Sequence, residues 1–318
     1  MKKIAFLFPG QGSQMIGMGR DVAEHYPAAR HVFDEADEAL RFPLTQLCWS
    51  GPDDRLKMTE VTQPAILTAS IAALRVLEQH GVQPSFCAGH SLGEYSAHVA
   101  AGTITFPDAV RTVRNRGRYM QDAVPPGEGA MAAVLGLKQA DVEQVCAEIA
   151  RQSGLVLSAA NINAPEQIVI SGAKRAVDEA MPVLKQRGAK RVIALAVSAP
   201  FHCALMQPAR ERLAVELKAL EFKAPRVPVV TNVDAVATGS AGEARQSLIE
   251  QVTAPVLWVQ VIERLIAERV ELFIEVGPGK VLCGLLRQID RAQSCLQVED
   301  EASLQKTLEA LSVSGARA

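Results

Sequence analysis

The sequence predicts an α/β protein built on a largely parallel sheet, and three observations lead to that class. Short apolar runs typical of buried strands alternate with amphipathic, helix-length segments along most of the chain. The 318 residues are 48% hydrophobic and 21% charged, an ordinary composition for a globular protein with a large core. No repeat or low-complexity tract interrupts the alternation. The length alone allows one large domain or two.

The amino-terminal part of the chain opens with a predicted buried strand. The apolar run at residues 4–8 follows two lysines, but it is too short for the core of a signal peptide, and Pro9-Gly10 ends it. The glycine-rich loop that follows lacks the dinucleotide-binding spacing, because Met15 stands where the third glycine would be. A helix is then expected to begin at Pro64 and to end at Gly81, leading to a second strand at residues 84–88.

A G-x-S-x-G run stands where that second strand gives way to a helix expected at residues 94–101. It reads Gly89-His90-Ser91-Leu92-Gly93. Such a context is typical of a nucleophile elbow, a strained turn that needs small residues two positions before and after the serine. The N–H of Leu92, at the start of the helix, is placed to stabilise an oxyanion. Taken alone, the pentapeptide also fits a glycine-rich turn with an incidental serine.

Residues 128–198 show a different order of elements. Strands are expected at residues 131–135, 155–161, 167–171 and 191–197, and helices at residues 139–150 and 174–187. This βαββαβ order is that of the ferredoxin-like split motif, which can form a compact four-stranded unit. We therefore expect a ferredoxin-like subdomain at residues 128–198, inserted into a discontinuous core of residues 1–127 and 199–318. Ligand sites often lie between two such bodies.

A serine nucleophile needs a base, and His202 is the best placed of the histidines. It follows a predicted strand at the subdomain boundary, where a residue of the cleft is expected. The polar helical or helix-end segments that carry His25, His31 and His80 are typical of surface residues. His90 adjoins the nucleophile, but its side chain is expected on the opposite face. His98 lies about 10 Å along the elbow helix, too far for a hydrogen bond to Ser91.

The helix expected at residues 107–123 carries an arginine on its apolar side. At about 100° per residue, Arg116 falls among Ala109, Val113 and Met120. An arginine directed into a core requires an anion, either a carboxylate of the protein or a ligand. An internal salt bridge and a bidentate clamp on a substrate carboxylate both fit the pattern. The second interpretation, combined with a serine nucleophile, indicates an acyl group that itself carries a carboxylate.

Charge and cysteine content exclude several classes of function. The formal net charge is -2, and no lysine- or arginine-rich block stands out, so no nucleic-acid partner is expected. The six cysteines are scattered without a C-x-x-C pair, which favours reduced thiols over a disulfide framework or a zinc site. We therefore expect a cytoplasmic protein with no metal and no membrane partner.

Five motifs together resemble one enzyme family. They are GQGSQ near the amino terminus, GHSLGE at the elbow, NRGRYM around Arg116, FHCALM at His202 and EVGPGKVL near the carboxyl end. In this order and spacing, from Ile4 to near Leu286, they closely resemble the malonyl-CoA:acyl carrier protein transacylases of bacterial type II fatty acid synthesis. The resemblance implies an α/β-hydrolase-like core that carries the ferredoxin-like subdomain.

The resemblance also implies a role for each matching residue. Ser91 would be the nucleophile, His202 its base, and Arg116 the ligand of the malonyl carboxylate. The backbone carbonyl of Gln251 would orient His202, which explains why no triad acid stands out in the sequence.

The remaining residues implied by the resemblance belong to the substrate pocket. The amides of Gln11 and Leu92 would form the oxyanion hole, and Met120 would contact the substrate. Phe201 resembles the phenylalanine of malonyl-selective relatives, where a ring would crowd an α-methyl group. A hydrophobic pocket distinguishes one methyl group by only ~1 to 3 kcal/mol.

The implied reaction is a ping-pong transfer through a malonyl-serine. Coenzyme A leaves in the first half, and the phosphopantetheine thiol of acyl carrier protein takes the malonyl group in the second. No cofactor is expected beyond the coenzyme A thioester, which is a substrate, and a monomer is the family's usual state. Since acyl carrier proteins are acidic, docking would use a basic patch. The candidates are Arg111, Arg114, Arg118, Lys190 and Arg191, although a charge-rich helix face is more often simply solvated.

Three alternatives share parts of this pattern. A serine esterase or thioesterase would share the elbow but would gain nothing from a buried cation. The transacylase subunit of a malonate decarboxylase would use the same chemistry with another carrier protein. A carrier-binding module without activity would not need nucleophile, base and arginine together.

Overall fold

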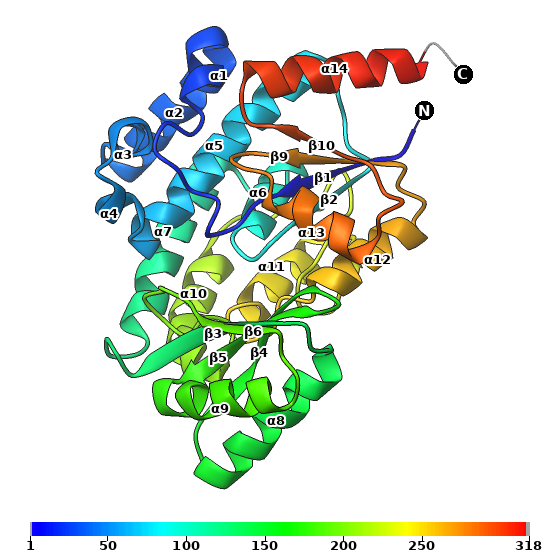
Figure 1. Cartoon of the computed structure of the whole chain (residues 1–318). Helices are drawn as coiled ribbons and strands as arrows, with labels where there is room; N and C mark the ends of the chain where they lie inside the picture. The colour runs from blue at the N-terminus through cyan, green and yellow to red at the C-terminus, as the bar shows by residue number, and fades with distance from the viewer. Residues whose placement is uncertain (1, 316–318) are drawn as a thin grey trace.

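The computed structural model of the chain describes residues 2–315 and shows two bodies, a larger one above and a smaller one below in Figure 1. The strands are β1 Ile4–Phe8, β2 Phe86–Gly89, β3 Gly129–Leu135, β4 Leu157–Ala164, β5 Gln167–Ala173, β6 Arg191–Ala194, β7 Val229–Val230, β8 Ala237–Thr238, β9 Leu272–Val276 and β10 Cys295–Val298. The helices are α1 Arg20–His25, α2 Pro27–Leu40, α3 Leu44–Ser50, α4 Asp53–Leu56, α5 Thr59–Gln79, α6 Gly93–Ala100, α7 Phe106–Asp122, α8 Gln139–Ser153, α9 Lys174–Gln186, the 3-10 turn η1 Ala204–Met206, α10 Gln207–Ala219, α11 Ala241–Glu250, α12 Trp258–Ala267, α13 Val281–Ile289 and α14 Glu301–Gly315.

The larger body is built on a sheet in the strand order β10-β9-β1-β2-β7-β8. Pairing is parallel from β10 to β7, and only the short β8 runs antiparallel to its neighbour. The predicted α/β class with a mainly parallel sheet is therefore confirmed. Parallel strands bury both faces, because the connecting helices cover them.

The alternation of side chains along β1 shows how both faces are covered. Phe6 and Phe8 pack into the hydrophobic cluster that contains the long helix α5. Ala5 and Leu7 point to the opposite face and pack with residues of α12 and α13. All four side chains are fully buried. Successive residues of a strand face opposite sides, so one apolar run of five residues supports two helical layers.

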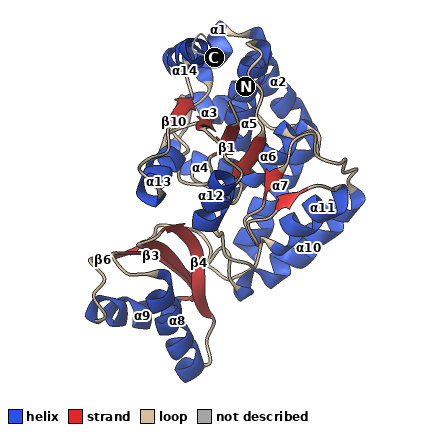
Figure 2. Ribbon diagram, turned by 90° about the vertical axis from the view of Figure 1, so that its right-hand side faces the viewer, coloured by secondary structure: helices blue, strands red, loops and turns tan. Residues whose placement is uncertain are grey.

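The smaller body is an antiparallel sheet in the order β4-β5-β3-β6, with α8 and α9 against one face (Figure 2). Its elements follow the predicted βαββαβ order within a few residues of the predicted limits. Ala132 and Val134 of β3 face the helices. Met131 on the same strand faces the larger body and joins its hydrophobic cluster.

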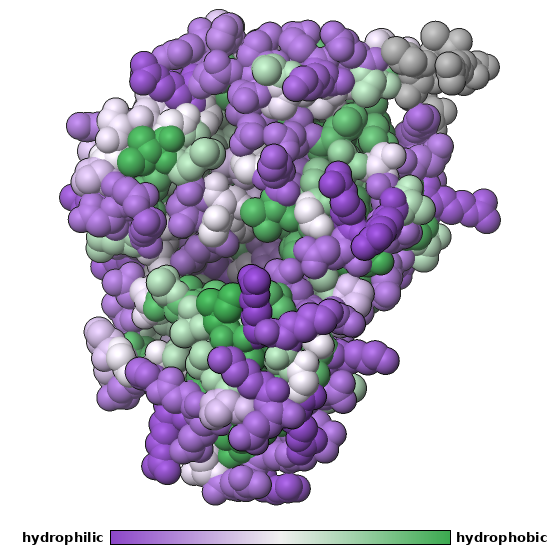
Figure 3. Space-filling view, viewed as in Figure 1, coloured by the Kyte–Doolittle hydropathy of each residue, from purple (hydrophilic) through white to green (hydrophobic). Residues whose placement is uncertain are grey.

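The second face of the smaller sheet closes a hollow between the two bodies. Figure 3 shows this hollow near the middle of the molecule, with hydrophobic residues along its lower edge. A cavity of about 190 Å³ lies there, lined from both bodies. Ligand sites often lie in such a position between two bodies of a fold.

Two predictions about local structure are wrong. The helix expected to begin at Pro64 begins at Thr59, and Pro64 lies inside it. The hydroxyl of Thr62 donates to the carbonyl of Leu56, so a polar side chain close to the start of the helix satisfies a backbone group there. Proline is tolerated this early because few backbone bonds are lost.

The second wrong prediction concerns the cysteines. Cys283 in α13 and Cys295 in β10 form a disulfide, with their Cα atoms 5.5 Å apart. The pair is 12 residues apart in sequence, and β10 returns beside α13, so the fold brings together thiols that no motif connects. The cysteines at positions 48, 87, 146 and 203 are free and buried.

No helix within residues 2–315 is long and apolar enough to cross a membrane.

Candidate functional site

Ser91 lies in a sharp turn between β2 and α6, with a backbone φ of 50°. This left-handed conformation is unusual for a residue with a side chain and is typical of strained functional turns. A Cβ atom on Gly89 would lie 2.0 Å from the carbonyl of Gly93, and one on Gly93 would lie 2.0 Å from the carbonyl oxygen of Phe8. Only glycine fits at either position, as the elbow motif predicts.

His202 belongs to the larger body and faces the serine near the junction of the two bodies. Its Nε2 atom lies 2.7 Å from Ser91 Oγ, although the residues are 111 positions apart in sequence. The other ring nitrogen, Nδ1, lies 2.9 Å from the carbonyl oxygen of Gln251 and 3.2 Å from that of Ala254. Two carbonyls can only accept, so the proton belongs on Nδ1, and Nε2 is left as the acceptor for the serine hydroxyl.

Burial decides the charge of this histidine. His202 is 3% exposed, and desolvation together with the positive charge of Arg116 lowers its pKa to about 3. Hydrogen bonds to the two carbonyls oppose the shift. The imidazole is therefore neutral at the pH of a cell, which is the state that can take a proton from a serine.

Arg116 lies in α7 with its guanidinium directed into the same space. The residue is 2% exposed. Its NH1 group donates to Gln63 Oε1 at 2.8 Å, and its NH2 group donates to Gln251 Oε1 at 2.9 Å and to Ser91 Oγ at 3.2 Å. No ion pair joins Arg116 to a carboxylate among residues 2–315. The internal salt bridge that the sequence allowed is absent there, and two neutral amides hold the cation instead.

The predicted site residues meet around one cavity. Gln11, Leu92, Met120 and Phe201 line it together with Ser91, His202 and Arg116. Gln251 does not line the cavity but contacts three of its residues by hydrogen bonds. The smaller body adds Met131, Asn161, Asn163, Val169, Leu195 and Val197 to the lining.

Several functional residues were not found from the sequence. Gln63 holds Arg116, and Asn163 Oδ1 lies 2.7 Å from His90 Nε2, which braces the elbow from the smaller body. Asn232 accepts the backbone N–H of Ser91 at 2.6 Å and donates to the carbonyl of Gly89 at 2.8 Å. The one available signal was a buried amide within an apolar helix at Gln63. The asparagines lie in loops or at strand ends, where such residues are common.

Within residues 2–315, no three His, Cys, Asp or Glu side chains gather closely enough to hold a metal ion. Lys280, in the glycine-rich turn after β9, lies outside the lining of the Ser91 cavity.

Comparison with known proteins shows to which proteins the chain is similar. Residues 5–307 match the family model of the acyl transferase domain. The chain is 49% identical over 311 residues to the malonyl CoA-acyl carrier protein transacylase of Bacillus subtilis, covering 98% of each protein. The crystal structure of an acyl carrier protein S-malonyltransferase from Vibrio cholerae superposes with a TM-score of 0.94 at 47% identity, covering 96% of this chain and 99% of that one.

A further solved structure has a partner bound. It contains a type II polyketide acyl carrier protein in complex with its malonyl-transacylase. That transacylase superposes with a TM-score of 0.94 at 45% identity, covering 97% of this chain and 99% of the other.

Proposed function

This chain belongs to the acyl transferase domain family, and on that premise we propose that it transfers a malonyl group from coenzyme A to acyl carrier protein through an ester on Ser91. The observation that carries the proposal is the guanidinium of Arg116, which has no carboxylate partner among the described residues and lies 3.2 Å from the serine oxygen. A cation in this position suits an acyl group that ends in a carboxylate.

In the first half of the reaction, His202 Nε2 takes the proton of Ser91 Oγ as the oxygen attacks the thioester carbonyl. A new C–O bond forms, and the negative charge moves to the carbonyl oxygen. Gln11 and Leu92 line the cavity, and their backbone N–H groups would stabilise that oxyanion. The C–S bond then breaks, and the thiolate of coenzyme A takes the proton from His202.

The second half reverses these steps with another thiol. His202 takes the proton of the phosphopantetheine thiol, and the sulfur attacks the malonyl ester. The C–O bond breaks, and Ser91 Oγ recovers its proton from His202. One thioester is exchanged for another, so the reaction needs no external energy and no cofactor beyond its substrates.

The carbonyl of Gln251 keeps His202 in the tautomer that both halves require. A carboxylate usually has this task in serine enzymes, and it also stabilises the charged imidazolium. A carbonyl stabilises that charge less. Burial and Arg116 lower the pKa of His202 to about 3, and the carbonyl opposes this shift less than a carboxylate would, so the imidazole stays neutral between the two transfers.

The alternatives differ in the acceptor of the acyl group. A serine esterase would discharge the ester to water, and a buried arginine beside the nucleophile is of no use for neutral acyl groups. The relatives named above are transacylases, which favours a carrier thiol as the acceptor. A malonate decarboxylase subunit would use the same residues with a different carrier.

The proposal is tested by incubating the protein with malonyl-CoA in the absence of acceptor and weighing it intact. Wild type should gain one malonyl group, and Ser91→Ala should gain none. Arg116→Ala should acylate with malonyl-CoA about 100-fold more slowly while accepting acetyl-CoA at least as well, because only the malonyl group uses the cation. Addition of acyl carrier protein should then remove the adduct from wild type. Hydrolysis without a stable adduct would favour an esterase.

Several finer predictions join this proposal. The sheet order of the smaller body supports a ferredoxin-like subdomain at residues 128–198, and the strand-turn-helix at Ser91 supports an α/β-hydrolase-like core at residues 1–127 and 199–318. A cytoplasmic location and a monomeric state stay predictions. Of the candidate docking residues, Arg111 pairs with Asp108 and Arg114 lies over the ring of Phe42, so internal contacts already engage part of that helix face.

A further inference from the structure

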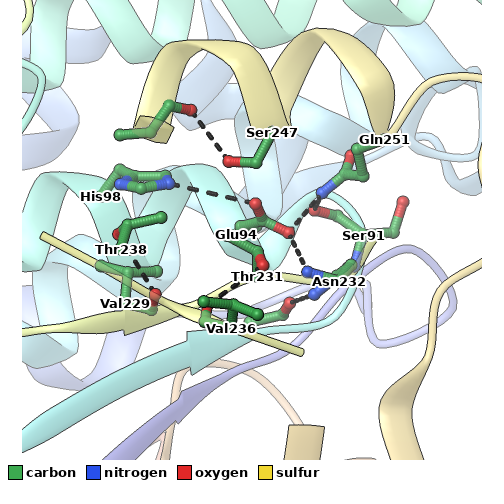
Figure 4. A network of polar contacts seen from close by, with 12 residues as sticks. Ser91, Glu94, His98, Val229, Thr231, Asn232, Val236, Thr238, Ser247 and Gln251 are labelled. Atoms are coloured by element: carbon green, nitrogen blue, oxygen red, sulfur yellow. Dashed lines mark hydrogen bonds and ion pairs between the residues drawn. The ribbon is translucent and has the colours of Figure 1, made fainter. Parts of the chain in front are cut away.

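Glu94 is a buried carboxylate one turn beyond the nucleophile, and no step of the proposed mechanism uses it. It lies in the first turn of α6 and is fully buried. Figure 4 shows it at the centre of a network of polar contacts, with Gln251 and Asn232 on the side of Ser91 and His98 on the other side. Burying a carboxylate is costly, so its contacts indicate what it does.

A single oxygen of this carboxylate accepts two hydrogen bonds. Glu94 Oε2 accepts from the side-chain Nε2 of Gln251 at 2.9 Å and from the backbone N–H of Asn232 at 2.9 Å (Figure 4). The two donors belong to loops after α11 and after β7, far from Glu94 in sequence. The carboxylate thus joins three separate segments behind the elbow.

Both partners of Glu94 act directly on the reacting residues. Gln251 donates to the Ser91 carbonyl at 3.0 Å, accepts from Arg116 at 2.9 Å and accepts from His202 Nδ1 through its backbone carbonyl at 2.9 Å. Asn232 accepts the backbone N–H of Ser91 at 2.6 Å. Nucleophile, base and cation are therefore each one hydrogen bond away from a partner of Glu94.

Glu94 is one of three neighbours that fix the side-chain amide of Gln251. An amide has one accepting end and one donating end, and a flip exchanges them. Arg116 can only donate, so it requires the oxygen. Glu94 Oε2 accepts from both partners and so requires the NH₂ group. The Ser91 carbonyl also accepts from this NH₂ group, so the three neighbours agree on one orientation. Without an acceptor at Glu94, one N–H of the buried amide would lose its partner, and only Arg116 and the Ser91 carbonyl would still hold the side chain.

The other carboxylate oxygen of Glu94, Oε1, accepts neither of these two hydrogen bonds. Oε1 has no hydrogen-bond partner among the described residues, and the nearest ring nitrogen, His98 Nε2, is 4.0 Å away. Burial raises the pKa of Glu94 to about 7, while its two donors and Arg116 oppose the rise and Asp234 adds to it. A proton on Oε1 would leave Oε2 a carbonyl oxygen, so the two accepted bonds survive in either charge state.

We propose that Glu94 is a positioning residue that fixes the side-chain amide of Gln251 and, through it, holds Arg116 and His202 in position relative to Ser91. This inference rests on the proposed function for the identity of the reacting residues, and it adds a residue to which the mechanism gives no part. The essential property is the hydrogen-bond acceptor at Oε2, not the charge.

Two substitutions separate these properties. Glu94→Gln keeps an acceptor and the volume, and it should form malonyl-enzyme within about threefold of the wild-type rate. Glu94→Met keeps the length but has no comparable acceptor, and it should be slower by about 100-fold, the loss typical of reacting groups displaced by about 1 Å. The loss should fall on the single-turnover rate at saturating malonyl-CoA, with thermal stability measured on the same samples.

A matched control is available in β9. Glu275 is also fully buried, and its carboxylate also accepts two hydrogen bonds, here both from backbone N–H groups: Leu282 to Oε1 at 3.0 Å and Cys283 to Oε2 at 2.8 Å. Burial raises its pKa to about 7 as well. It does not line the Ser91 cavity. Glu275→Met should therefore lower the unfolding temperature without changing the acylation rate of the folded protein.

A double-mutant cycle with Gln251→Ala tests the route of the effect. If Glu94 acts through the Gln251 side chain, Glu94→Met should slow Gln251→Ala by less than about threefold, because coupled residues are not additive. A full 100-fold further loss in that background would overturn the inference. So would a loss of more than tenfold in Glu94→Gln, a variant that remains informative even if Glu94→Met does not fold.

The proposed function is judged separately, by the adduct on wild type. A fluorophosphonate reagent that labels activated serines adds a second readout, since it needs the Ser91–His202 pair but no malonyl group. Wild type that is labelled but never malonylated would contradict the proposed function. The Glu94 inference would then be judged on labelling, which should be slowed in Glu94→Met and unchanged in Glu94→Gln; equal labelling of all three proteins would refute it.

Discussion

The two bodies of the molecule contribute different things to one cavity. The larger body supplies every group proposed to react, and two of them, Ser91 and His202, lie in left-handed backbone with φ of 50° and 58°. The smaller body supplies walls, mainly apolar side chains and two asparagines. Its contribution comes from one face of the antiparallel sheet, where the pairing of β4 is irregular beside Asn161, and from the loop after β6 that carries Leu195 and Val197. Within residues 128–198 only glycine has a positive φ.

The difference shows that geometry and shape are provided by separate parts of the fold. Reactive groups need fixed positions, and strained backbone held by a rigid sheet provides them. Walls need only the right volume and polarity, which a sheet face offers through alternating side chains. Substitutions in the larger body should therefore change the chemical step, while substitutions in the smaller body should change substrate affinity.

The largest expected effect comes from the elbow itself. Gly93→Ala would place a Cβ atom 2.0 Å from the carbonyl oxygen of Phe8, a backbone atom of the central strand β1 that cannot move aside cheaply. We expect the variant to lose more than about 3 kcal/mol of unfolding free energy. Malonyl-enzyme formation should be undetectable. Chemical denaturation and intact mass measure the two effects.

Gly242 provides the control for that variant. It lies in α11, its φ is not positive, and a Cβ there would meet nothing within 4 Å. Gly242→Ala should be neutral or stabilise the protein by up to about 1 kcal/mol. If both alanines were tolerated equally, the close approach of α6 to β1 would not be what restricts the elbow to glycine.

The next prediction concerns selectivity between malonyl and methylmalonyl groups. It would limit the division between the two bodies, because Phe201 belongs to the larger body and yet would act on the shape of the cavity. Phe201 lines the cavity beside the base and is 8% exposed. Phe201→Ser should open space for an α-methyl group and improve methylmalonyl over malonyl transfer by about tenfold, within the range for one methyl group. Competition between the two thioesters, read as adduct masses, measures the ratio. An unchanged ratio would remove Phe201 from the specificity pocket.

The sequence predicted the local features of this fold well. Element types, the elbow and the order of strands in the smaller body all follow from short-range patterns of apolar residues, glycine and proline. The start of α5 is the exception: Pro64 is a strong signal that predicts the start five residues late, while Met58, the capping residue at the true start, makes no side-chain cap bond. Propensity carries no information about such uncapped ends.

Contacts between distant segments were beyond the sequence. Ser91, His202 and Arg116 could be proposed because their residue types are unusual in their local context. Asn232 and Glu94 could not, since an asparagine in a loop and a glutamate in the first turn of a helix are ordinary there. The Cys283–Cys295 pair was missed for the same reason, because only the packing of β10 beside α13 brings the sulfurs together.

A smaller effect should follow from loosening the contact between the two bodies. Asn163 of β4 bonds His90 of the elbow at 2.7 Å and is the polar link from the wall to the nucleophile turn. Asn163→Ala should raise the KM for malonyl-CoA by about threefold to tenfold and leave kcat within about twofold, the size of one lost hydrogen bond. Asn163→Asp keeps the acceptor but adds a negative charge to the cavity wall, so it should raise the KM as well, because that charge opposes the malonyl carboxylate. A fall in kcat alone would contradict the division between chemistry and shape.

The smallest expected effect is on the pH dependence of malonyl transfer, which should be flat over a wide range. Because burial and Arg116 lower the pKa of His202 to about 3, the folded protein keeps this base neutral where an ordinary histidine would be protonated. Single-turnover malonyl transfer to Ser91 should therefore be flat from about pH 8 to about pH 5, without an acid limb near 6.5. A limb centred near 6.5 would show that the base is solvated, and the cavity would then be more open than its walls indicate.

The free energy of unfolding should also depend on pH, because buried histidines and buried glutamates change it in opposite directions. His98 and His202 have pKa values lowered from 6.5 to about 3. Below pH 6.5 the unfolded chain therefore binds more protons than the folded protein does, and stability falls as the pH drops. Glu94 and Glu275 have values raised from 4.5 to about 7, so between these limits the folded state gains stability as pH drops. The two pairs offset each other from about pH 6.5 to 4.5. Below 4.5 the raised carboxyls no longer oppose the histidines, and Glu243 and Asp290, whose pKa values are lowered by hydrogen bonds, add to the loss, so thermal unfolding should show the loss beginning there. Glu94→Gln removes one opposing carboxyl, so its loss should begin nearer pH 6.5.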